Sequence, residues 1–394
     1  MAVARRVGVV HPMFTTRGVF HGGGGEAVCA HVLEALQDDY EVTLLTFDSV
    51  NLEEMNLRFG TALSPDRIQI RLLSYPPGLA PLLQGHTTLN GVTKNLAAQQ
   101  ARRLRHKYDL LISTYNEMDL GEPGLQYIHF PDMALWLPPE LESALARRLP
   151  VRWVRRRALA VMSGFSYARM KRNKTLVNSR WTKRLVHQVH GIDAEVLYPP
   201  LRFDFPKVPW EQKEPGFVCV GRLFPNKRVH VIIEIVRQLR MSGIDTHLHI
   251  IGSLPDPEYG AEILRLCERH KDWCTYEGAP DRFRLVELLA RHRFGIHAME
   301  HEHFGIAVAE MAAAGAVVFI PAGGGQTEIV PFPELQYTSV EDAVAKVAAV
   351  FRDPVHAREL HERLQRQMHS FSPTYFASRV RELVADALAH RAVG

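Results

Sequence analysis

Two glutamates stand eight positions apart in the string E-H-F-G-I-A-V-A-E (302–310). The segment 306–314 is predicted as a helix that is apolar almost all round, so no Lys or Arg at a helical neighbour position can pair with Glu310. Because burying a lone carboxylate is costly, Glu310 needs another partner, and ribose or sugar hydroxyls are natural donors. Glu302 lies just before the helix start, where backbone N–H groups favour an anion such as a sugar phosphate. The two glutamates therefore predict ligand binding.

Two cations, Arg222 and Lys227, lie in the string G-R-L-F-P-N-K (221–227), directly after the apolar strand predicted at 217–220. A diphosphate fits there, because Arg offers a planar fork of donors and Lys a mobile point charge. The same pair could stabilise charge that grows on a departing diphosphate. Either residue alone would be interpreted as part of a solvated basic loop.

A glycine-rich loop, H-G-G-G-G-E (21–26), lies between the first predicted strand and the first predicted helix. The loop contains four glycines just before a helix N-terminus: Gly22, Gly23, Gly24 and Gly25. Because no Cβ obstructs their backbone N–H groups, this loop can bind an anion. The string also fits the loose dinucleotide pattern G-x-G-x-x-A, with Asp48 placed as a ribose-binding acid. However, residues 11–21 separate the strand from the first glycine, whereas that fingerprint needs a tight turn. An NAD-dependent oxidoreductase stays an alternative on these residues.

Short apolar runs alternate with helical patterns along the whole chain, which predicts βαβ units and parallel sheets. We expect two doubly wound α/β domains, with the ligand site beyond the carboxyl ends of the strands, in the cleft between the two facing domains. The stretch 199–216 carries five prolines without periodicity, which predicts a linker at 201–215, between an N-terminal domain 1–200 and a C-terminal domain 216–372. The predicted strands are 6–10, 42–47, 68–73, 110–113, 125–130, 176–178 and 196–198, then 217–220, 248–251, 294–298 and 317–320.

The composition is that of a globular protein with a large core, since 46% of its 394 residues are hydrophobic and 23% are charged. The formal net charge is +4, yet the stretch 147–174 carries ten Arg or Lys and no acid, while the remaining residues carry 37 basic and 43 acidic groups. This basic patch is interpreted either as a solvated face or as a contact for an anionic membrane or acceptor. The near balance of the whole chain, 47 basic against 43 acidic residues, argues against nucleic-acid binding.

Other kinds of site leave little signal in the sequence. The four cysteines lack C-x-x-C spacing, no signal-peptide pattern opens the chain, and no run of 18 apolar residues occurs, so we expect a cytoplasmic protein with reduced thiols. His297, His301 and His303 surround Glu302, but their positions across a strand end and a loop do not secure a metal geometry, and we expect no metal site. No G-x-S-x-G or Walker A string is present, which argues against a hydrolase or a P-loop kinase.

Taken together, these motifs resemble the retaining glycosyltransferases of the family usually called GT4, which have the GT-B fold. The resemblance rests on the E-x7-E pair, the G-R-L-x-P-x-K loop and the glycine-rich loop, and it spans nearly the whole chain. The closer pattern is similar to α-1,2-mannosyltransferases that extend lipid-linked oligosaccharides. That pattern comprises G-G-G-G-E (22–26), Y-I-H-F-P (127–131), V-N-S-R-W-T (177–182), Y-P-P (198–200), E-H-F-G-I (302–306) and G-G-G-Q-T-E-I-V (323–330).

The resemblance implies roles for these residues. Arg222 and Lys227 would hold the donor diphosphate, Glu310 the ribose and Glu302 the hydroxyls of the donor sugar. His129 matches the family's active-site histidine on the acceptor side, without a general-base role, because the leaving phosphate takes the acceptor's proton. Other donor contacts are expected from Gly24, Gly25, Gly278, His303, Phe304, Gly305 and Ile306, and other acceptor contacts from Gly22, Gly23 and Glu26.

The implied reaction is transfer of a hexose, with mannose from GDP-mannose as the favoured donor, to a hydroxyl of a glycan, lipid-linked or natural-product acceptor. An α-bond forms with retention, and neither a metal nor another cofactor is expected to be required. A UDP-sugar donor (glucose or N-acetylglucosamine) is the first alternative, and an epimerase or a donor-binding protein without an acceptor is the second. As in the relatives, helix 373–394 is expected to pack back on the first domain. The basic patch 147–174 could give the protein peripheral contact with the cytoplasmic face of a membrane.

Overall fold

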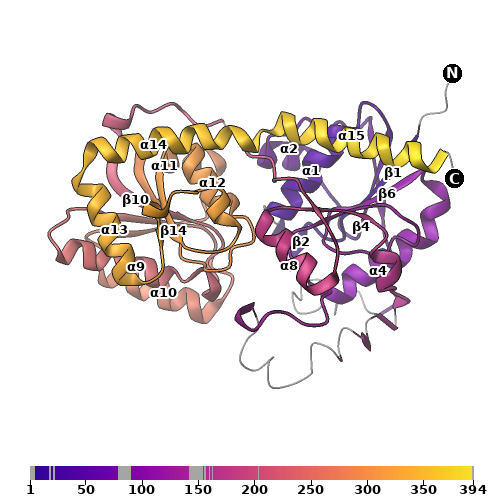
Figure 1. The fold of residues 1–394 in the computed structure, drawn as a ribbon, viewed down its shortest axis with the longest axis horizontal. Helices are drawn as coiled ribbons and strands as arrows, with labels where there is room; N and C mark the ends of the chain where they lie inside the picture. The colour runs from indigo at the N-terminus through magenta and orange to yellow at the C-terminus, as the bar shows by residue number, and fades with distance from the viewer. Residues whose placement is uncertain are drawn as a thin grey trace. The chain divides into compact units, whose positions relative to one another are not determined.

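The computed structural model describes residues 5–16, 19–20, 23–78, 90–141, 154, 157–158, 160–161, 163–202 and 204–392. The chain divides into two compact units (Figure 1). Unit 1 comprises Met1–Pro200 together with Pro373–Gly394, and unit 2 comprises Leu201–Ser372.

Unit 1 is built on a seven-stranded sheet in which every neighbouring pair of strands is parallel. The spatial order is β5-β4-β1-β6-β7-β8-β9. The chain therefore builds outward from β1 in one direction and then continues from β6 in the other, which makes the β1/β6 boundary a topological switch point. The strands are β1 (Arg6–Val10), β4 (Glu41–Thr46), β5 (Ile68–Leu72), β6 (Leu110–Ser113), β7 (Leu125–Ile128), β8 (Lys174–Val177) and β9 (Glu195–Val196), and a short hairpin is formed by β2 (Thr15–Thr16) and β3 (Val19–Phe20).

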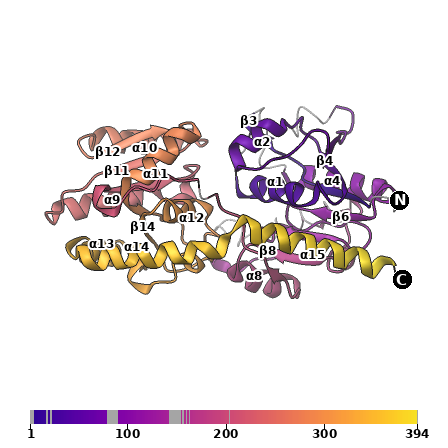
Figure 2. The same ribbon diagram turned by 90° about the horizontal axis from the view of Figure 1, so that it is seen from above.

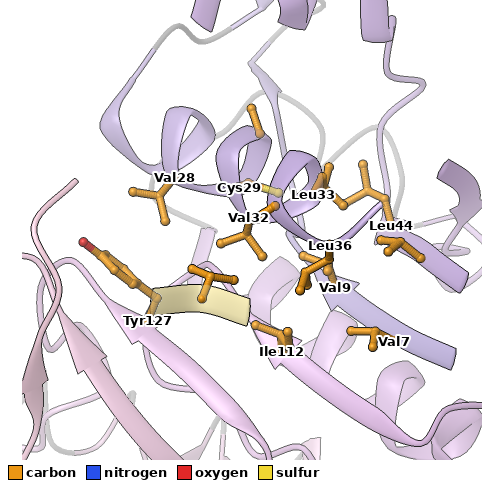
Figure 3. Close-up of a cluster of buried hydrophobic side chains, with 14 of the residues drawn as sticks. Val7, Val9, Val28, Cys29, Val32, Leu33, Leu36, Leu44, Ile112 and Tyr127 are labelled. Carbon is orange, nitrogen blue, oxygen red and sulfur yellow. The ribbon is translucent and has the colours of Figure 1, made fainter. Parts of the chain in front are cut away.

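One core cluster of unit 1 lies between this sheet and two helices that are far apart in the sequence. In α1, Val28, Val32 and Leu36 recur every four residues, and they pack onto Val9 and Ile112 of the sheet (Figure 3). The last helix of the chain, α15, packs against α1 (Figures 1 and 2). The described helices of this unit are α1 (Gly24–Leu36), α2 (Leu52–Phe59), α4 (Asn90–Leu104), α7 (Tyr167–Met170), α8 (Arg180–His190) and α15 (Pro373–Ala392).

Unit 2 is a second parallel sheet, with the order β12-β11-β10-β13-β14-β15 and its switch point between β10 and β13. One layer of helices contains α9, α10 and α13, and the other contains α11, α12 and α14, with the sheet between them (Figure 1). The strands are β10 (Glu214–Val220), β11 (Leu248–Ile251), β12 (Cys274–Gly278), β13 (His292–Ile296), β14 (Val317–Pro321) and β15 (Gln336–Tyr337). The helices are α9 (Val229–Met241), α10 (Pro257–Arg269), α11 (Arg282–Arg291), α12 (Ile306–Ala313), α13 (Val340–Arg352) and α14 (Pro354–Met368).

The predicted fold class, two doubly wound α/β units, is confirmed. The residues 201–215, which were expected to form a linker, are grouped with unit 2. Trp210 is buried and stacks on His361 with ring centroids 4.9 Å apart, and Leu201 N–H donates to the carbonyl of Phe371. The proline-rich segment contains a short 3-10 helix at Trp210–Gln212 and the start of β10 at Glu214, and its buried side chains tie it to the core of unit 2.

Among the described residues, no helix is both long enough and apolar enough to span a membrane.

Candidate active site

Three loops meet at the carboxyl ends of β10, β11 and β12, on one side of the switch point of unit 2. Gly221 N–H donates to the carbonyl of Ile251, and Gly252 N–H donates to the carbonyl of Gly278 at 2.6 Å. The space beside the Cα of Gly278 is open. The hydrogen bonds show how the sheet positions these loops.

Glu302 lies in the loop between β13 and α12, on the other side of the same switch point. Its Oε2 accepts from Lys227 Nζ at 2.5 Å, and its Oε1 accepts from the backbone N–H of His303 at 3.2 Å. His297 Nε2 is 3.3 Å from the same Oε2, without the alignment of a hydrogen bond. Lys227 and Glu302, which are 75 residues apart, are therefore brought together by the neighbouring strands β10 and β13.

The charge on Glu302 is fixed by these neighbours. Burial alone would raise the pKa of Glu302, but the Lys227 ammonium and then His297 hold it well below its usual range. Burial lowers the pKa of His303 to about 4 against the opposing effect of Glu302. At neutral pH the loop thus presents an ionised carboxylate, a hydrogen-bond acceptor suited to hydroxyl groups, beside a neutral imidazole.

The backbone of this loop is held by the glycines that follow β14. Gly325 N–H donates to the carbonyl of Glu302 at 2.6 Å. Gly324 has φ +73°, and a Cβ there would lie 2.5 Å from that same carbonyl oxygen, so a side chain at 324 would displace the loop. The buried Gln326 donates from Nε2 to the carbonyl of Met299 at 2.9 Å. The string G-G-G-Q therefore positions Glu302.

α12 begins directly after this loop with Ile306, and its N-cap residue, a glycine, supplies no side-chain cap. The residue before it, Gly305, has φ +105°. Phe304 is buried and packs edge-on against Phe371, with ring centroids 5.5 Å apart. The first N–H groups of a helix lack intrahelical partners and carry its positive dipole end. An anion next to Ile306 would therefore be stabilised.

Glu310 has a partner that sequence reasoning missed. Its Oε1 accepts from Arg282 Nη1 at 2.9 Å, and Arg282 Nη2 donates to Asp204 at 3.0 Å. The expectation that Glu310 depends on ligand hydroxyls for a donor is thus corrected, because the first residue of α11 supplies one. Its second carboxylate oxygen, Oε2, forms no hydrogen bond with the residues described, and 20% of the side chain is exposed.

Arg222 differs from its neighbour Lys227. Its side chain is exposed and forms neither a hydrogen bond nor an ion pair with any residue in the described ranges, and its guanidinium lies 5.9 Å from the ring centroid of Phe224. Because a free guanidinium can bind phosphate oxygens with two parallel hydrogen bonds, Arg222 is the more available of the two predicted cations.

In unit 1, His129 follows β7 and lies next to the start of α1. Its Nε2 donates to the carbonyl of Thr114 at 3.1 Å, because a carbonyl can only accept, and its backbone N–H donates to Asn116 Oδ1. A Cβ on Gly25 would lie 3.6 Å from that Nε2. Gly24 is the first residue of α1, and Gly23 precedes it without any side-chain cap.

The remaining acceptor-side predictions have separate outcomes. Glu26 lies in the first turn of α1, and Gly22 lies outside the described residues. The structure adds His11, which sequence reasoning did not select. Its ring is fully buried, with Nδ1 2.9 Å from Thr114 Oγ1, and Nε2 has no hydrogen-bond partner among the residues described.

A buried ionic network fixes the loop that carries His129. Lys94 is 2% exposed and pairs with Glu117 at 3.3 Å and with Asp132, while Glu117 also accepts from His190 at 2.9 Å. Although burial opposes it, Lys94 holds the pKa of Glu117 far below its ordinary value. Glu117 also accepts a hydrogen bond from the backbone N–H of Met133. This bond ties the network to the segment that follows His129.

Five of the ten basic residues of the patch 147–174 lie outside the described residues: Arg147, Arg148, Arg152, Arg155 and Arg156. Of its described members, Arg169 pairs with Asp119 at 2.7 Å and Lys174 pairs with Glu195 at 2.9 Å. These two cations are therefore neutralised within unit 1.

Residues 202–369 match the protein-family model for glycosyl transferases group 1, and the match covers unit 2 almost from end to end. These residues form a glycosyl transferases group 1 domain. The E-x7-E glutamates, Arg222 and Lys227 all lie within it.

Comparisons that extend beyond this domain found a relative in sequence and two structures with a similar fold. The GDP-Man:Man(3)GlcNAc(2)-PP-Dol α-1,2-mannosyltransferase of Candida glabrata is 25% identical over 356 residues, which cover 79% of this chain and 70% of that protein. Sucrose-phosphate synthase from Thermosynechococcus elongatus superposes with a TM-score of 0.71 at 16% identity, covering 98% and 100% of the two chains. Anabaena Alr3699/HepE in complex with UDP-glucose gives a TM-score of 0.68 at 14% identity, covering 97% and 99%.

The predicted GT-B fold and the predicted family resemblance are thus confirmed. The glycosyl transferases group 1 domain and the mannosyltransferase relatives identify the chain as a hexosyltransferase.

Proposed function

We propose that this glycosyltransferase moves mannose from GDP-mannose to a hydroxyl of a lipid-linked glycan, forming an α-glycosidic bond with retention. The glycosyl transferases group 1 domain supports the reaction class, and the Candida glabrata relative, whose name states GDP-mannose, a dolichol-linked acceptor and an α-1,2 linkage, supports the substrates. The single observation that carries the site is the ionised Glu302 beside Lys227, at the switch point of unit 2.

The donor diphosphate is proposed to bind between Arg222 and the N-terminus of α12. Arg222 forms neither a hydrogen bond nor an ion pair with the described residues and can form two hydrogen bonds to phosphate oxygens. Lys227 is already next to Glu302 and would be shared between this carboxylate and the phosphate. These cations, with the uncapped helix, supply the positive charge that a metal ion provides in other diphosphate sites, so no metal is proposed in the reaction centre.

The two glutamates are proposed to read hydroxyl groups. Glu302, ionised and held in place, would accept from hydroxyls of the donor sugar. Glu310 would accept from a ribose hydroxyl through Oε2, while Arg282 keeps Oε1 in place. His303, Gly305 and Gly278 would line the donor with their backbone.

In the proposed step, the acceptor oxygen forms a bond to the anomeric carbon as the bond from that carbon to the diphosphate oxygen breaks. The acceptor's proton passes to the leaving phosphate oxygen. Arg222 and Lys227 stabilise the negative charge on the diphosphate as it departs. His129, whose Nε2 is engaged by the carbonyl of Thr114, would position the reacting sugar from the acceptor side and would not act as a base.

The test is release of free GDP from GDP-mannose by the purified chain, with and without a lipid-linked oligosaccharide that ends in mannose. UDP-glucose and UDP-N-acetylglucosamine are run in parallel, and each donor is also tested for a rise in Tm. We expect GDP release that depends on acceptor, and a Tm response to GDP and GDP-mannose. If only a UDP-sugar gives a response, the donor is that UDP-sugar and the proposal of GDP-mannose is wrong. If GDP is released equally without acceptor, the proposed transfer to an acceptor is wrong.

A matched pair of variants locates the reaction. Glu302→Gln removes the charge that pairs with Lys227, and we expect turnover to fall at least about 100-fold, as for other electrostatic groups in active sites. Glu300→Gln, two residues away, removes an exposed carboxylate that pairs with Arg228, and we expect nearly normal turnover. Equal activity of the two variants would remove Glu302 from the site.

The place of action is also a proposal. A dolichol-linked acceptor, as the name of the Candida glabrata relative states, lies in a membrane, so peripheral contact with a cytoplasmic membrane face would suit this reaction. The patch 147–174 is the stretch whose charge fits an anionic surface.

A further inference from the structure

Three histidines gather at the edge of the unit 2 sheet where its strands begin. His247 precedes β11, His249 lies within it, and His292 is the first residue of β13. One ring nitrogen from each of the three lies within 4.8 Å of the others. The donor loops described above follow the carboxyl ends of these strands, so this cluster is at the opposite edge of the sheet.

The three rings meet because the strand between them carries a glycine. β10 lies between β11 and β13, and its residue Gly216 faces the ring of His247. A Cβ on Gly216 would lie 2.1 Å from His247 Nε2, closer than two unbonded atoms can approach. The missing side chain thus opens the space in which histidines from two non-adjacent strands come together.

A carboxylate completes the group with distances that suit a metal ion. His247 Nε2 is 3.2 Å from His292 Nε2, and Glu214 Oε2 is 3.5 Å from the first nitrogen and 3.8 Å from the second. Ligands about 2.0–2.1 Å from a tetrahedral Zn²⁺ are roughly 3.3 Å from each other. The ring of His249 is 4.7 Å from that of His292, centroid to centroid, and can supply the fourth ligand atom.

The histidine nitrogens that face away from the cluster have the partners that metal-binding histidines use. His292 Nδ1 donates to the carbonyl of Leu288 at 2.7 Å, which leaves the lone pair on Nε2. His249 Nδ1 is 2.6 Å from Glu277 Oε1, and Arg284 lies 3.4 Å from the other oxygen of this carboxylate. Such outer partners fix the tautomer and the orientation of metal-binding imidazoles.

Glu214 is oriented in the same way. Arg291 binds Oε1 of Glu214 at 2.5 Å and leaves Oε2 turned toward the two histidine nitrogens. Two of the rings are largely enclosed, since the side chain of His292 is 1% exposed and that of His249 is 21% exposed. His247, at 33%, keeps the access from solvent that a metal ion needs to enter.

We propose that His247, His249, His292 and Glu214 bind one Zn²⁺ ion, which links β10, β11 and β13 at the edge of the sheet remote from the donor loops. Imidazole nitrogens and a carboxylate are ligands that Zn²⁺ takes in tetrahedral sites. With four protein ligands the ion has no open position, so its role is structural. The transfer reaction does not use it, and the proposal stands apart from the proposed function.

The experiment uses the full chain, dialysed against a chelator and then titrated with Zn²⁺ alone. We expect one ion bound per chain by mass spectrometry of metals, a rise in Tm on addition, and the intense visible absorption of tetrahedral Co²⁺ when cobalt replaces zinc. His247→Gln removes the most exposed ligand with the least disturbance of packing. It should lower Zn²⁺ affinity at least about 10–100-fold, the range that loss of an outer partner alone produces.

The control is His356→Gln, which removes an exposed histidine on α14 that pairs with Glu359, and its Zn²⁺ affinity should equal that of the unchanged chain. Acceptor-dependent GDP release should be the same in all three proteins, which separates this proposal from the proposed function. Equal zinc binding by His247→Gln would place the ion elsewhere, for instance at the thiols of Cys267 and Cys274, and would overturn the proposal. Failure of the unchanged, folded chain to bind stoichiometric zinc would overturn it as well.

Discussion

Ion pairs decide which side chains of unit 2 are available to a ligand. Arg222 is open, Lys227 is engaged by Glu302, and Glu310 is engaged by Arg282 through one oxygen. A ligand would therefore meet a carboxylate whose position is already fixed. The consequence is that residues outside the family motifs set the geometry of residues inside them.

Arg282→Gln tests this consequence. Glu310 would lose a charged hydrogen bond of 2.9 Å and would adopt several orientations, so its contact to a ribose hydroxyl would weaken. Since a hydrogen bond to a charged group contributes about 1.5–3 kcal/mol, we expect KM for the donor to rise about tenfold or more with little change in kcat. Arg363→Gln is the matched control, because Arg363 also pairs with a glutamate and lies over a phenylalanine ring. An equal rise in KM for both variants would show a general loss of stability.

His11 makes the stability of unit 1 depend on pH. Burial and then His129 lower the pKa of His11 from 6.5 to about 3. The unfolded chain therefore binds one proton more than the folded chain between these values, so stability is highest above pH 6.5 and falls as the pH drops toward 3. The slope is about 1.4 kcal/mol per pH unit in that window.

The measurement is the urea concentration at which unit 1 is half unfolded, at several pH values in this range. Hydrogen exchange of the β1 amides reports the unfolding. His11→Asn does not titrate and should lose this slope, whereas His356→Asn, exposed on α14 of the other unit, should keep it. A pH profile that is identical in His11→Asn and the unchanged chain would exclude His11 as the source.

Sequence reasoning located the residues that stand in strings and missed those that the fold collects. Arg222 and Lys227 share one loop, and Glu302 shares a string with Glu310, so spacing alone was enough to select them. Arg282 pairs with a residue 28 positions away across two helices, and no local pattern marks it. The histidines of the proposed zinc site leave no local pattern either. They come together only because β10 pairs with its two neighbouring strands.

At the scale of elements, the strands predicted from apolar runs are present, with ends that differ by a few residues. β12 was not predicted, because its sequence C-T-Y-E-G contains no apolar run. Only its first residue is buried. α11 was not predicted either, since Arg and Glu fill the positions outside its short apolar stripe. β12 is an edge strand of its sheet, where the apolar signal is weakest, whereas α11 contacts the central strand β10 and α12.

α15 shows how one element completes the core of unit 1. Phe376, Val380, Val384 and Leu388 recur every four residues and are buried in the core cluster that contains α1. Phe376→Ala should lower the free energy of unfolding of unit 1 by about 3–5 kcal/mol, through lost burial and the remaining cavity. Tyr375→Ala is the matched control, because Tyr375 is 60% exposed on the same helix and its loss should cost little. Urea unfolding with a probe in unit 1 measures both, and equal midpoints would show that α15 is not part of this core.

At the scale of the whole molecule, both units place their candidate site residues by the same rule. In unit 1, His11 and Thr114 follow β1 and β6, the strands that flank the switch point. In unit 2, Gly221 and His297 follow β10 and β13, which flank the other switch point. In each sheet the carboxyl ends of the strands carry the candidate site residues. The amino ends of the strands of unit 2 are then available for the proposed structural ion.

This arrangement predicts which amides a donor protects from hydrogen exchange. GDP should slow exchange in the loops 221–228 and 276–282 and at the start of α12, because the nucleotide is proposed to bind unit 2. If Gly24 and Gly25 also contact the donor, GDP-mannose should slow exchange at residues 23–26 in unit 1 as well, through the uncapped N-terminus of α1. The comparison is made by mass spectrometry with UDP as a control ligand, at concentrations of about 100 times the Kd of GDP. Protection confined to unit 2 by both GDP and GDP-mannose would restrict the glycine-rich loop to the acceptor, and protection confined to unit 1 would contradict the assignment of the donor to unit 2.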